Sequence, residues 1–396
     1  MHALTRLMKG DRVIWAVVFL LSLFSLLAVY SSTGTLAFKY QEGNTEYYLI
    51  KHLLLLIAGF GIIILFHTIR YTYYSRLSQI AIFISIPLLL ITLLMGTNLN
   101  SADRWLTLPG VNLTFQTSDL AKLALIIYVA RLLSKKQHII SNFKEAFIPI
   151  MLPICSVCAL ILPADFSTAA ILFVTCMLLM FLGGMSIKYL LGVGGAGILL
   201  GGILLVVLFT VPESSLPGRS LTWKRRLQEF GIGAGREGQL ATNHAENSYQ
   251  VQQSKIAIAA GGFLPKGPGT SRQRNFLPHP YSDFIYAIII EEYGSIIGGG
   301  GILLLYLILL YRVILLALKN PGSFGSVLAM GCGLLLIFQA MINMAVAVNI
   351  MPVTGQTLPL VSMGGTSILF TSAALGIILS VSREVAPEKV QAHVAA

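Results

Sequence analysis

This sequence has few charged residues. Only 11% of its 396 residues are Asp, Glu, Lys or Arg, against roughly 25% in soluble domains, whereas 56% are hydrophobic. A soluble globule of this length would lack the charge to cover its surface, so the composition excludes a cytosolic enzyme, a disordered protein and a nucleic-acid-binding module. The surplus of 27 Lys and Arg over 16 Asp and Glu therefore indicates membrane topology first.

Cysteine is also scarce. All four cysteines lie in apolar runs, where cysteine behaves as a small hydrophobic residue. Cys155 and Cys158 form a C-x-x-C pair, but the polar loop and second pair of a zinc site do not accompany it. We therefore expect no metal or redox role for these thiols.

Ten apolar runs reach or approach the roughly 20 residues that a helix needs to cross a bilayer. We therefore expect an all-α polytopic membrane protein, with a single integral membrane domain over residues 1–396 and about ten transmembrane helices. The apolar run 284–290 either extends the eighth helix or lies against it as a re-entrant piece. The expected spans are 13–31, 48–67, 77–95, 120–133, 146–162, 167–185, 189–211, 295–318, 324–350 and 358–382.

The positions of the basic residues orient the chain. An even number of spans places both termini on one side, and more than half of the Lys and Arg residues lie in the tails, short loops and span ends of that side. Most of the others lie in the long loop 212–283, and loops above about 60 residues do not count reliably in the positive-inside rule. We expect both termini in the cytoplasm, and this loop, between helices 7 and 8, outside.

Glycines inside the spans admit two interpretations. Gly192, Gly194 and Gly197 formally match G-x-G-x-x-G, but they lie within an apolar span and not after a strand. Close helix–helix contact explains them better. The run 298–301 is interpreted in the same way, with a flexible joint as the alternative.

The outer loop contains two expected helices. Trp223, Leu227 and Phe230 can share one helical face, which is typical of a helix in the headgroup layer; a solvated turn is the alternative. A second helix is expected over 247–260, ending at two glycines. A turn-rich stretch follows, and Asp283 closes the loop at the membrane boundary.

Carboxylates near or within spans are functional candidates because the bilayer makes them costly. Lys122 follows Asp119 by three residues and lies on the same helical face. This spacing suits an ion pair that fixes helix packing, and it equally suits a cation that binds an anionic substrate. The five candidate acids are Asp119, Asp165, Asp283, Glu291 and Glu292.

Several motifs, in family order from residue 104 to 367, resemble the SEDS family (FtsW, RodA, SpoVE). Arg104-Trp105 and the run QTSDL at 116–120 with Lys122 are similar to the family's R-W and Q-P-S-E-L…K signatures. The runs LPHPYSDFI at 277–285 and EEYG at 291–294 resemble its L-P-x-x-x-[ST]-D-F-[IV]…E-E-x-G block. Gln339 and Asn343, with PVTG at 352–355, LP at 358–359 and SMGGTS at 362–367, complete the C-terminal signature.

The sequence also departs from the family pattern. Thr117 stands where proline is frequent, Asp119 where glutamate is, and Met363 where tyrosine is. His279 and Tyr281 replace residues that are commonly glutamate and histidine, so no role is carried over to these two side chains. Within the family, the run GPGTSRQR at 267–274 is more similar to the division protein FtsW than to the elongation protein RodA.

The resemblance implies a peptidoglycan glycosyltransferase of the bacterial cytoplasmic membrane that works at the division septum. Its substrate would be lipid II, the undecaprenyl-diphosphate-linked disaccharide pentapeptide, polymerised on the outer face. The implied partners are a class B penicillin-binding protein, which cross-links the strands, and other divisome membrane proteins, with no nucleic acid.

A mechanism can be stated for such a reaction. An α-linked donor that gives a β-linked product implies inversion by one carboxylate base, and Asp283 is our candidate. The leaving diphosphate needs cations. No cofactor is certain from the sequence. A divalent cation (Mg or Mn) could help to neutralise the leaving diphosphate, and Glu291 and Glu292 are its candidate ligands. Helix capping or ion pairing explains these two acids at least as well. The expected substrate-binding residues are Arg104, Trp105, Lys122, Arg272, Arg274, Ser282, Ser362, Gly364 and Gly365.

Three alternatives stay open. A flippase or transporter of lipid-linked precursors would suit ten spans with intramembrane charges, but the sequence has no convincing internal repeat of the kind found in secondary transporters. A non-catalytic scaffold for division partners is the second alternative. An elongation-type polymerase is the third.

Overall fold

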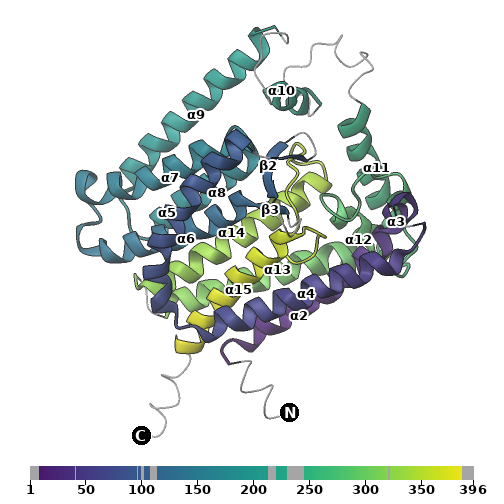
Figure 1. The fold of residues 1–396 in the computed structure, drawn as a ribbon, viewed down its shortest axis with the longest axis horizontal. Helices are drawn as coiled ribbons and strands as arrows, with labels where there is room; N and C mark the ends of the chain where they lie inside the picture. The colour runs from purple at the N-terminus through teal and green to yellow at the C-terminus, as the bar shows by residue number, and fades with distance from the viewer. Residues whose placement is uncertain are drawn as a thin grey trace, which may run out of the picture.

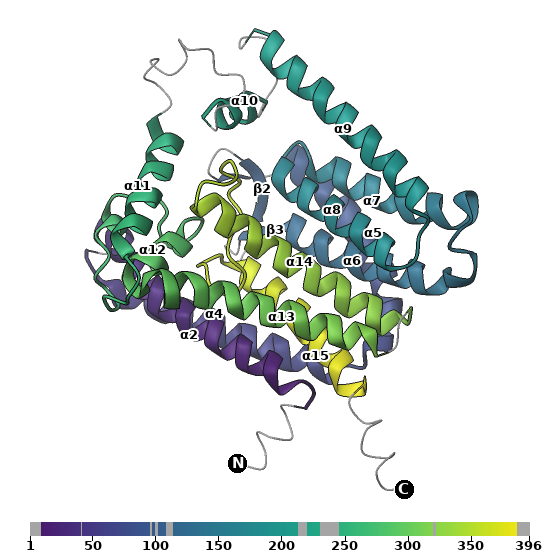
Figure 2. The ribbon, with the colours of Figure 1, turned by 180° about the vertical axis from the view of Figure 1, so that it is seen from behind.

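Long helices run side by side in one bundle (Figure 1 and Figure 2). This computed structural model describes residues 9–40, 42–95, 97–99, 102–107, 114–212, 220–229, 245–319 and 322–385. The helices that match the ten predicted spans are α2 (Arg12–Ser32), α4 (Thr45–Thr68), α5 (Tyr71–Met95), α6 (Thr117–Lys135), α7 (Ile148–Ile161), α8 (Phe166–Leu182), α9 (Ile187–Thr210), α13 (Gly301–Leu318), α14 (Phe324–Ala347) and α15 (Thr366–Val385).

The predicted polytopic helical fold is confirmed. Eight segments of the described chain are long and apolar enough to cross a membrane, and α6 and the shorter α8 pack in the same bundle, where both contact α14. α15 begins at Thr366, later than predicted, because the preceding residues include Pro352, Gly355 and Pro359 and form a loop.

The apolar run before the eighth span extends that span through a break. α12 (Ile285–Tyr293) is followed by a π-helical turn, η5 (Gly294–Gly300), and then by α13. Together they cover Ile285–Leu318, about 50 Å at 1.5 Å per residue, more than the roughly 30 Å of a bilayer core. Gly294 has a φ of 73°, and a Cβ there would lie 2.6 Å from the carbonyl oxygen of Phe263. Glycine at this position therefore makes the break possible.

A small antiparallel sheet, which the sequence analysis missed, connects α5 to α6. Its strands are β1 (Thr97–Leu99), β2 (Ala102–Thr107) and β3 (Thr114–Gln116), in the order β1-β2-β3. Trp105 pairs with Gln116 across β2 and β3, and α6 begins at the next residue. Strands of three to six residues in a polar loop carry too little alternation to be recognised in the sequence.

Both helices expected in the outer loop are present as α10 (Ser220–Glu229) and α11 (Ala245–Gly261). Trp223 of α10 packs against Phe166 of α8, with ring centroids 5.5 Å apart, so its ring contacts the bundle. Phe230 lies outside the described residues. The shorter elements are α3 (Gly34–Tyr40), η1 (Gln137–Ile139), η2 (Phe143–Phe147) and η4 (Gln273–Asn275).

Polar contacts tie three helices together at the end of the bundle where α2 begins. The Asp11 carboxylate caps α2 by accepting from the Val13 N–H at 2.9 Å, and it pairs with Nε of Arg312 on α13 at 2.7 Å. The Asp11 N–H donates to Oγ of Ser382 on α15 at 3.1 Å. The start of α2 and the end of α15 therefore lie together, as an even number of crossings requires.

Glycines of the bundle fall into two groups. In α9, apart from the helix's own nearby backbone, no described atom lies within 4 Å of the place that a Cβ would take at Gly192, Gly194 or Gly197, so the predicted close helix contact is not found for them within the described chain. α9 runs along the edge of the bundle (Figure 1). In η5, a Cβ at Gly298 would lie 2.5 Å from the carbonyl oxygen of Ile289, so close approach is confirmed there.

A matched pair of substitutions tests this distinction. Gly376→Val is expected to lower the free energy of unfolding by about 1–3 kcal/mol, because a Cβ at Gly376 would lie 2.7 Å from Cβ of Phe66 and 2.8 Å from the carbonyl oxygen of Ile63. Gly197→Val would meet open space and should leave the unfolding temperature nearly unchanged. Thermal unfolding of both purified variants in detergent measures the difference, and equal losses would contradict it.

Candidate functional site

Asp283 stands immediately before α12, half-buried between two loops. The hydroxyl of Ser282 donates to its Oδ1 at 2.8 Å. On the opposite side, a Cβ at Gly355 would lie 3.7 Å from its Oδ2. The carboxylate therefore lies where the end of the outer loop meets the loop before α15.

The backbone around Asp283 is fixed by hydrogen bonds from distant parts of the chain. Nδ2 of Asn343, on α14, donates to the carbonyl oxygens of Asp283 at 2.9 Å and of Gln356 at 2.7 Å. The Ser362 hydroxyl donates to the carbonyl oxygen of Ser282 at 2.7 Å, and the Met363 N–H donates to that of Tyr281 at 2.9 Å. Two segments, α14 and the loop before α15, thus hold the backbone of Asp283 in one place.

The predicted residues Ser362, Gly364 and Gly365 lie in the loop that provides these contacts. Ser362 is buried, and its hydroxyl also accepts from the Leu358 N–H at 2.8 Å. Gly365 has a φ of 54°, a conformation that favours glycine, and α15 starts at the next residue. Ser362 therefore acts on Asp283 through the backbone of Ser282, and the glycines let the loop turn into α15.

Asp165 is linked to this loop by Gln356, a residue that was not among the predicted site residues. Its Oδ1 accepts from the Thr168 N–H at 3.1 Å and caps α8, and its Oδ2 accepts from the Thr168 hydroxyl at 2.7 Å. Nε2 of Gln356 donates to Oγ1 of Thr168 at 2.8 Å. With Asn343, these residues form a chain from α8 to the backbone of Asp283. Gln356 lies in the irregular loop before α15, where no sequence periodicity marks it.

A large groove opens beside the same loop. Its volume is about 790 Å³, and the surfaces that surround it are mainly apolar side chains of α8, α9, α10 and α14, with Asp165 and Arg226 among the lining residues. Residues 351–354, which line it as well, lead directly to Gly355 beside Asp283. The groove can therefore hold a long apolar group whose polar end approaches Asp283.

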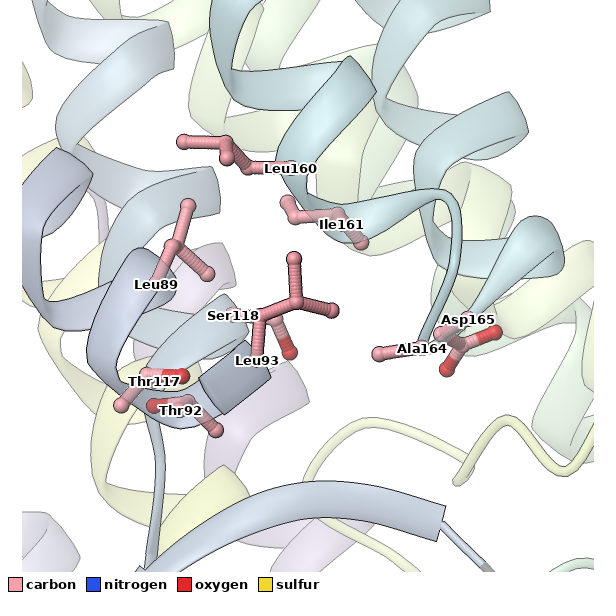
Figure 3. A pocket seen from close by; sticks show the side chains of 9 residues that line it. All are labelled: Leu89, Thr92, Leu93, Thr117, Ser118, Leu160, Ile161, Ala164 and Asp165. Carbon is pink, nitrogen blue, oxygen red and sulfur yellow. The ribbon is translucent and has the colours of Figure 1, made fainter. Parts of the chain in front are cut away.

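A second, water-sized cavity lies on the other side of Asp165. Figure 3 shows Thr117 and Ser118, at the start of α6, across this cavity from Asp165. Its volume of about 20 Å³ is enough for one water molecule. The start of α6 therefore lies close to the acid that borders the large groove.

Lys122 lies one turn further along α6. Its Nζ is 2.7 Å from Oδ1 of Asp119, and both side chains are buried. Oδ2 of Asp119 has no hydrogen-bond partner among the described atoms. The predicted contact between these two residues is confirmed, and it leaves open whether the lysine also binds a substrate.

Two of the other predicted cations belong to a loop away from Asp283. Arg272 and Arg274 lie beside the far end of α12, and that helix has nine residues, about 13 Å in length. Arg272 has an exposed side chain, whereas the Arg274 guanidinium donates to the carbonyl oxygen of Ser31 at 3.1 Å. The structure describes the backbone of Arg104 and Trp105 on β2 but not their side chains.

Glu291 and Glu292, the candidate metal ligands, accept hydrogen bonds from the loop that carries these arginines. Glu291 accepts from the Arg272 N–H at 3.0 Å, and Glu292 accepts from the Gly269 N–H at 3.0 Å. Among the described residues, no group of three or more His, Cys, Asp or Glu side chains could hold a metal ion. The described donor set thus does not fit a dedicated divalent-cation site.

The sequence matches a family described as Cell cycle protein (FtsW/RodA/SpoVE) over residues 11–386. A relative from Trichlorobacter lovleyi, named probable peptidoglycan glycosyltransferase FtsW, is 31% identical over 95% of this chain and 94% of its own. The stage V sporulation protein E of Bacillus subtilis is 33% identical over 96% of this chain and 98% of its own.

Solved structures share the fold. A chain from a peptidoglycan synthase complex, studied for how it coordinates polymerization and crosslinking, superposes with a TM-score of 0.67 at 25% identity, over 96% of this chain and 99% of that one. The rod shape determining protein RodA from Thermus thermophilus gives a TM-score of 0.62 at 24% identity, over 96% of this chain and 98% of that one. The likeness to RodA concerns the arrangement of the helices.

Proposed function

Because this chain belongs to the FtsW/RodA/SpoVE family of cell cycle proteins, we propose that it is a peptidoglycan glycosyltransferase that polymerises lipid II. We place the reaction on the outer face of the cytoplasmic membrane, with both termini in the cytoplasm. The observation that carries the proposal is the position of Asp283, a half-buried carboxylate whose backbone is held by α14 and the loop before α15, next to a groove for a long apolar group.

In this mechanism Asp283 is the general base. It takes the proton from the 4-hydroxyl of the acceptor sugar, and the oxygen forms a bond to the anomeric carbon of the donor as the bond from that carbon to the diphosphate breaks. The electron pair leaves with the diphosphate, and because this is a single displacement from the opposite face, the configuration inverts. The contacts from Asn343 and Ser362 hold the base in place for this step.

The diphosphate and the lipid chain need separate environments. Lys122 is our candidate cation for the departing diphosphate, because the start of α6 borders Asp165 and hence the groove. The apolar side chains of the groove suit the polyprenyl chain. A divalent cation could share the neutralisation of charge, but no step is assigned to it because the described residues do not form a site for it.

The protein acts at the division septum together with partner proteins. The relative named FtsW and the run at 267–274 favour division over elongation. A neighbour from a peptidoglycan synthase complex supports assembly with a class B penicillin-binding protein, and other divisome membrane proteins would accompany it.

Reconstitution tests the function directly. The purified protein, with its class B penicillin-binding protein and lipid II, is expected to yield a ladder of glycan strands on a gel. Fluorescent lipid II in liposomes tests the main alternative at the same time. Movement of lipid II between leaflets without any polymer would contradict the proposal and favour a flippase.

A further inference from the structure

Two consecutive carboxylates at the far end of α12 accept hydrogen bonds from the backbone of one loop. Glu291 is 3% exposed and Glu292 is fully buried. The loop 266–275 turns around them and contains Arg272 and Arg274. Buried carboxylates are costly unless they are paired or hydrogen-bonded, so their contacts show what they do.

Glu291 is surrounded by donors from the second half of the loop. Its Oε1 accepts from the Arg272 N–H at 3.0 Å, and its Oε2 accepts from the Gln273 N–H at 3.3 Å and from the Ser271 hydroxyl. The Ser271 hydroxyl in turn accepts from the Arg274 N–H at 3.1 Å. The carboxylate thus holds the backbone N–H groups of Arg272 and Gln273 directly, and that of Arg274 through the Ser271 hydroxyl.

Glu292 holds the first half of the loop and links it to α2. Its Oε1 accepts from the N–H groups of Gly269 at 3.0 Å and Ser271 at 3.3 Å, and from the hydroxyl of Ser31 at the end of α2. Its carbonyl oxygen accepts from the N–H groups of residues 266 and 267. The Arg274 guanidinium closes the arrangement by donating to Oγ and to the carbonyl oxygen of Ser31, both at 3.1 Å.

The two arginines of this loop differ in their surroundings. Arg274 is engaged with α2, whereas the side chain of Arg272 is exposed while its backbone is held. Asp283 stands at the start of α12 and Glu292 at its end, about 13 Å apart along the helix. A departing diphosphate is bonded to the carbon under attack and so lies near the base, whereas the backbone of Arg272 is held at the far end of α12.

We propose that Glu291 and Glu292 are positioning residues that hold Arg272 to bind the diphosphate of the second lipid-linked substrate, the acceptor. The inference rests on the proposed function. Polymerisation brings two lipid-linked molecules together, and the acceptor carries its diphosphate at the end of its disaccharide away from the reacting hydroxyl. The length of α12 likewise separates Asp283 from the loop that carries Arg272, and the hydrogen bonds of Glu291 and Glu292 hold that loop in place.

Substrate dependence tests the proposal. Arg272→Met and Glu291→Gln are expected to raise the KM for lipid II about tenfold, the loss of one hydrogen bond between charged groups, with kcat within about twofold of wild type. The double variant should be no worse than Arg272→Met alone, because both changes remove the same interaction. Arg70→Met, an exposed cation at the opposite end of the bundle, serves as the matched control and should change neither constant.

Two measurements keep the test independent of folding and of turnover. Ser271→Ala removes one donor to Glu291 and provides a milder variant if Glu291→Gln fails to fold. Binding of lipid II to the Asp283→Asn protein, with and without Arg272→Met, needs no polymerisation, so it distinguishes a failed proposed function from a failed acceptor site. Weaker binding upon Arg272→Met supports the site even if the wild-type protein makes no polymer.

Other results would overturn the inference. An unchanged KM with a lower unfolding temperature would show that Glu291 and Glu292 only stabilise the loop 266–275. A lower kcat at unchanged KM would assign Arg272 to the departing group. If the effect of Arg272→Met disappears in detergent without phospholipid, the arginine binds a bilayer headgroup phosphate and not the substrate.

Discussion

Asp283→Asn is expected to abolish glycan synthesis by the reconstituted protein, with a loss of roughly 10²–10⁴ in rate. The amide cannot take the proton of the acceptor hydroxyl. Its oxygen can still accept from the Ser282 hydroxyl, and the backbone contact from Asn343 does not involve the side chain. Insertion, unfolding temperature and binding of the penicillin-binding protein should therefore stay close to wild type, and a gel of the polymerised product measures the loss.

Glu46→Gln is a suitable control for this substitution. Glu46 is an exposed acid in the first turn of α4, so removing its charge should leave the rate unchanged. Polymer at the wild-type level from Asp283→Asn would remove Asp283 as the base. Growth of cells that carry only this variant would favour a scaffolding role instead.

Lys122→Met is expected to have the second large effect. It leaves the Asp119 carboxylate buried without its cation at 2.7 Å, which typically costs about 3–5 kcal/mol. The unfolding temperature should fall markedly, and glycan synthesis should be lost. Thermal unfolding together with the polymerisation assay measures both.

The double variant Asp119→Asn/Lys122→Met separates packing from substrate binding. Removing both charges of a buried pair is often nearly neutral for stability, so the unfolding temperature should recover. If Lys122 binds the departing diphosphate, glycan synthesis will not recover with it. Recovery of both properties would show that the pair serves only to pack α6.

The spans and the candidate base were predictable because each depends on local sequence. Hydropathy alone located all ten helices, even α6 with its buried Asp119 and Lys122. Asp283 was identified by its motif and by its place at the end of the outer loop. The break at Gly294 was less visible, since one glycine with a φ of 73° looks like any other glycine in an apolar run.

What could not be predicted depends on contacts between distant residues. The Ser31 hydroxyl meets Glu292, 261 residues later, and Gln356 meets Thr168, 188 residues earlier. No spacing rule connects such pairs. For this reason the sequence could not show that oxygens of Glu291 and Glu292, the candidate metal ligands, accept from a loop backbone. Nor could it show that this loop holds the backbone of Arg272 and Arg274 beside the end of α12 that is remote from Asp283.

α9 buries only Leu190 and Leu208 against the described structure, so most of its surface lies outside the contacts of the bundle. Leu204, Leu205 and Leu208 of this helix nevertheless line the groove. A helix with few protein contacts adapts its tilt to the thickness of the bilayer, tilting more in a thin membrane. We therefore expect the room in the groove to depend on the thickness of the membrane, through the tilt of α9.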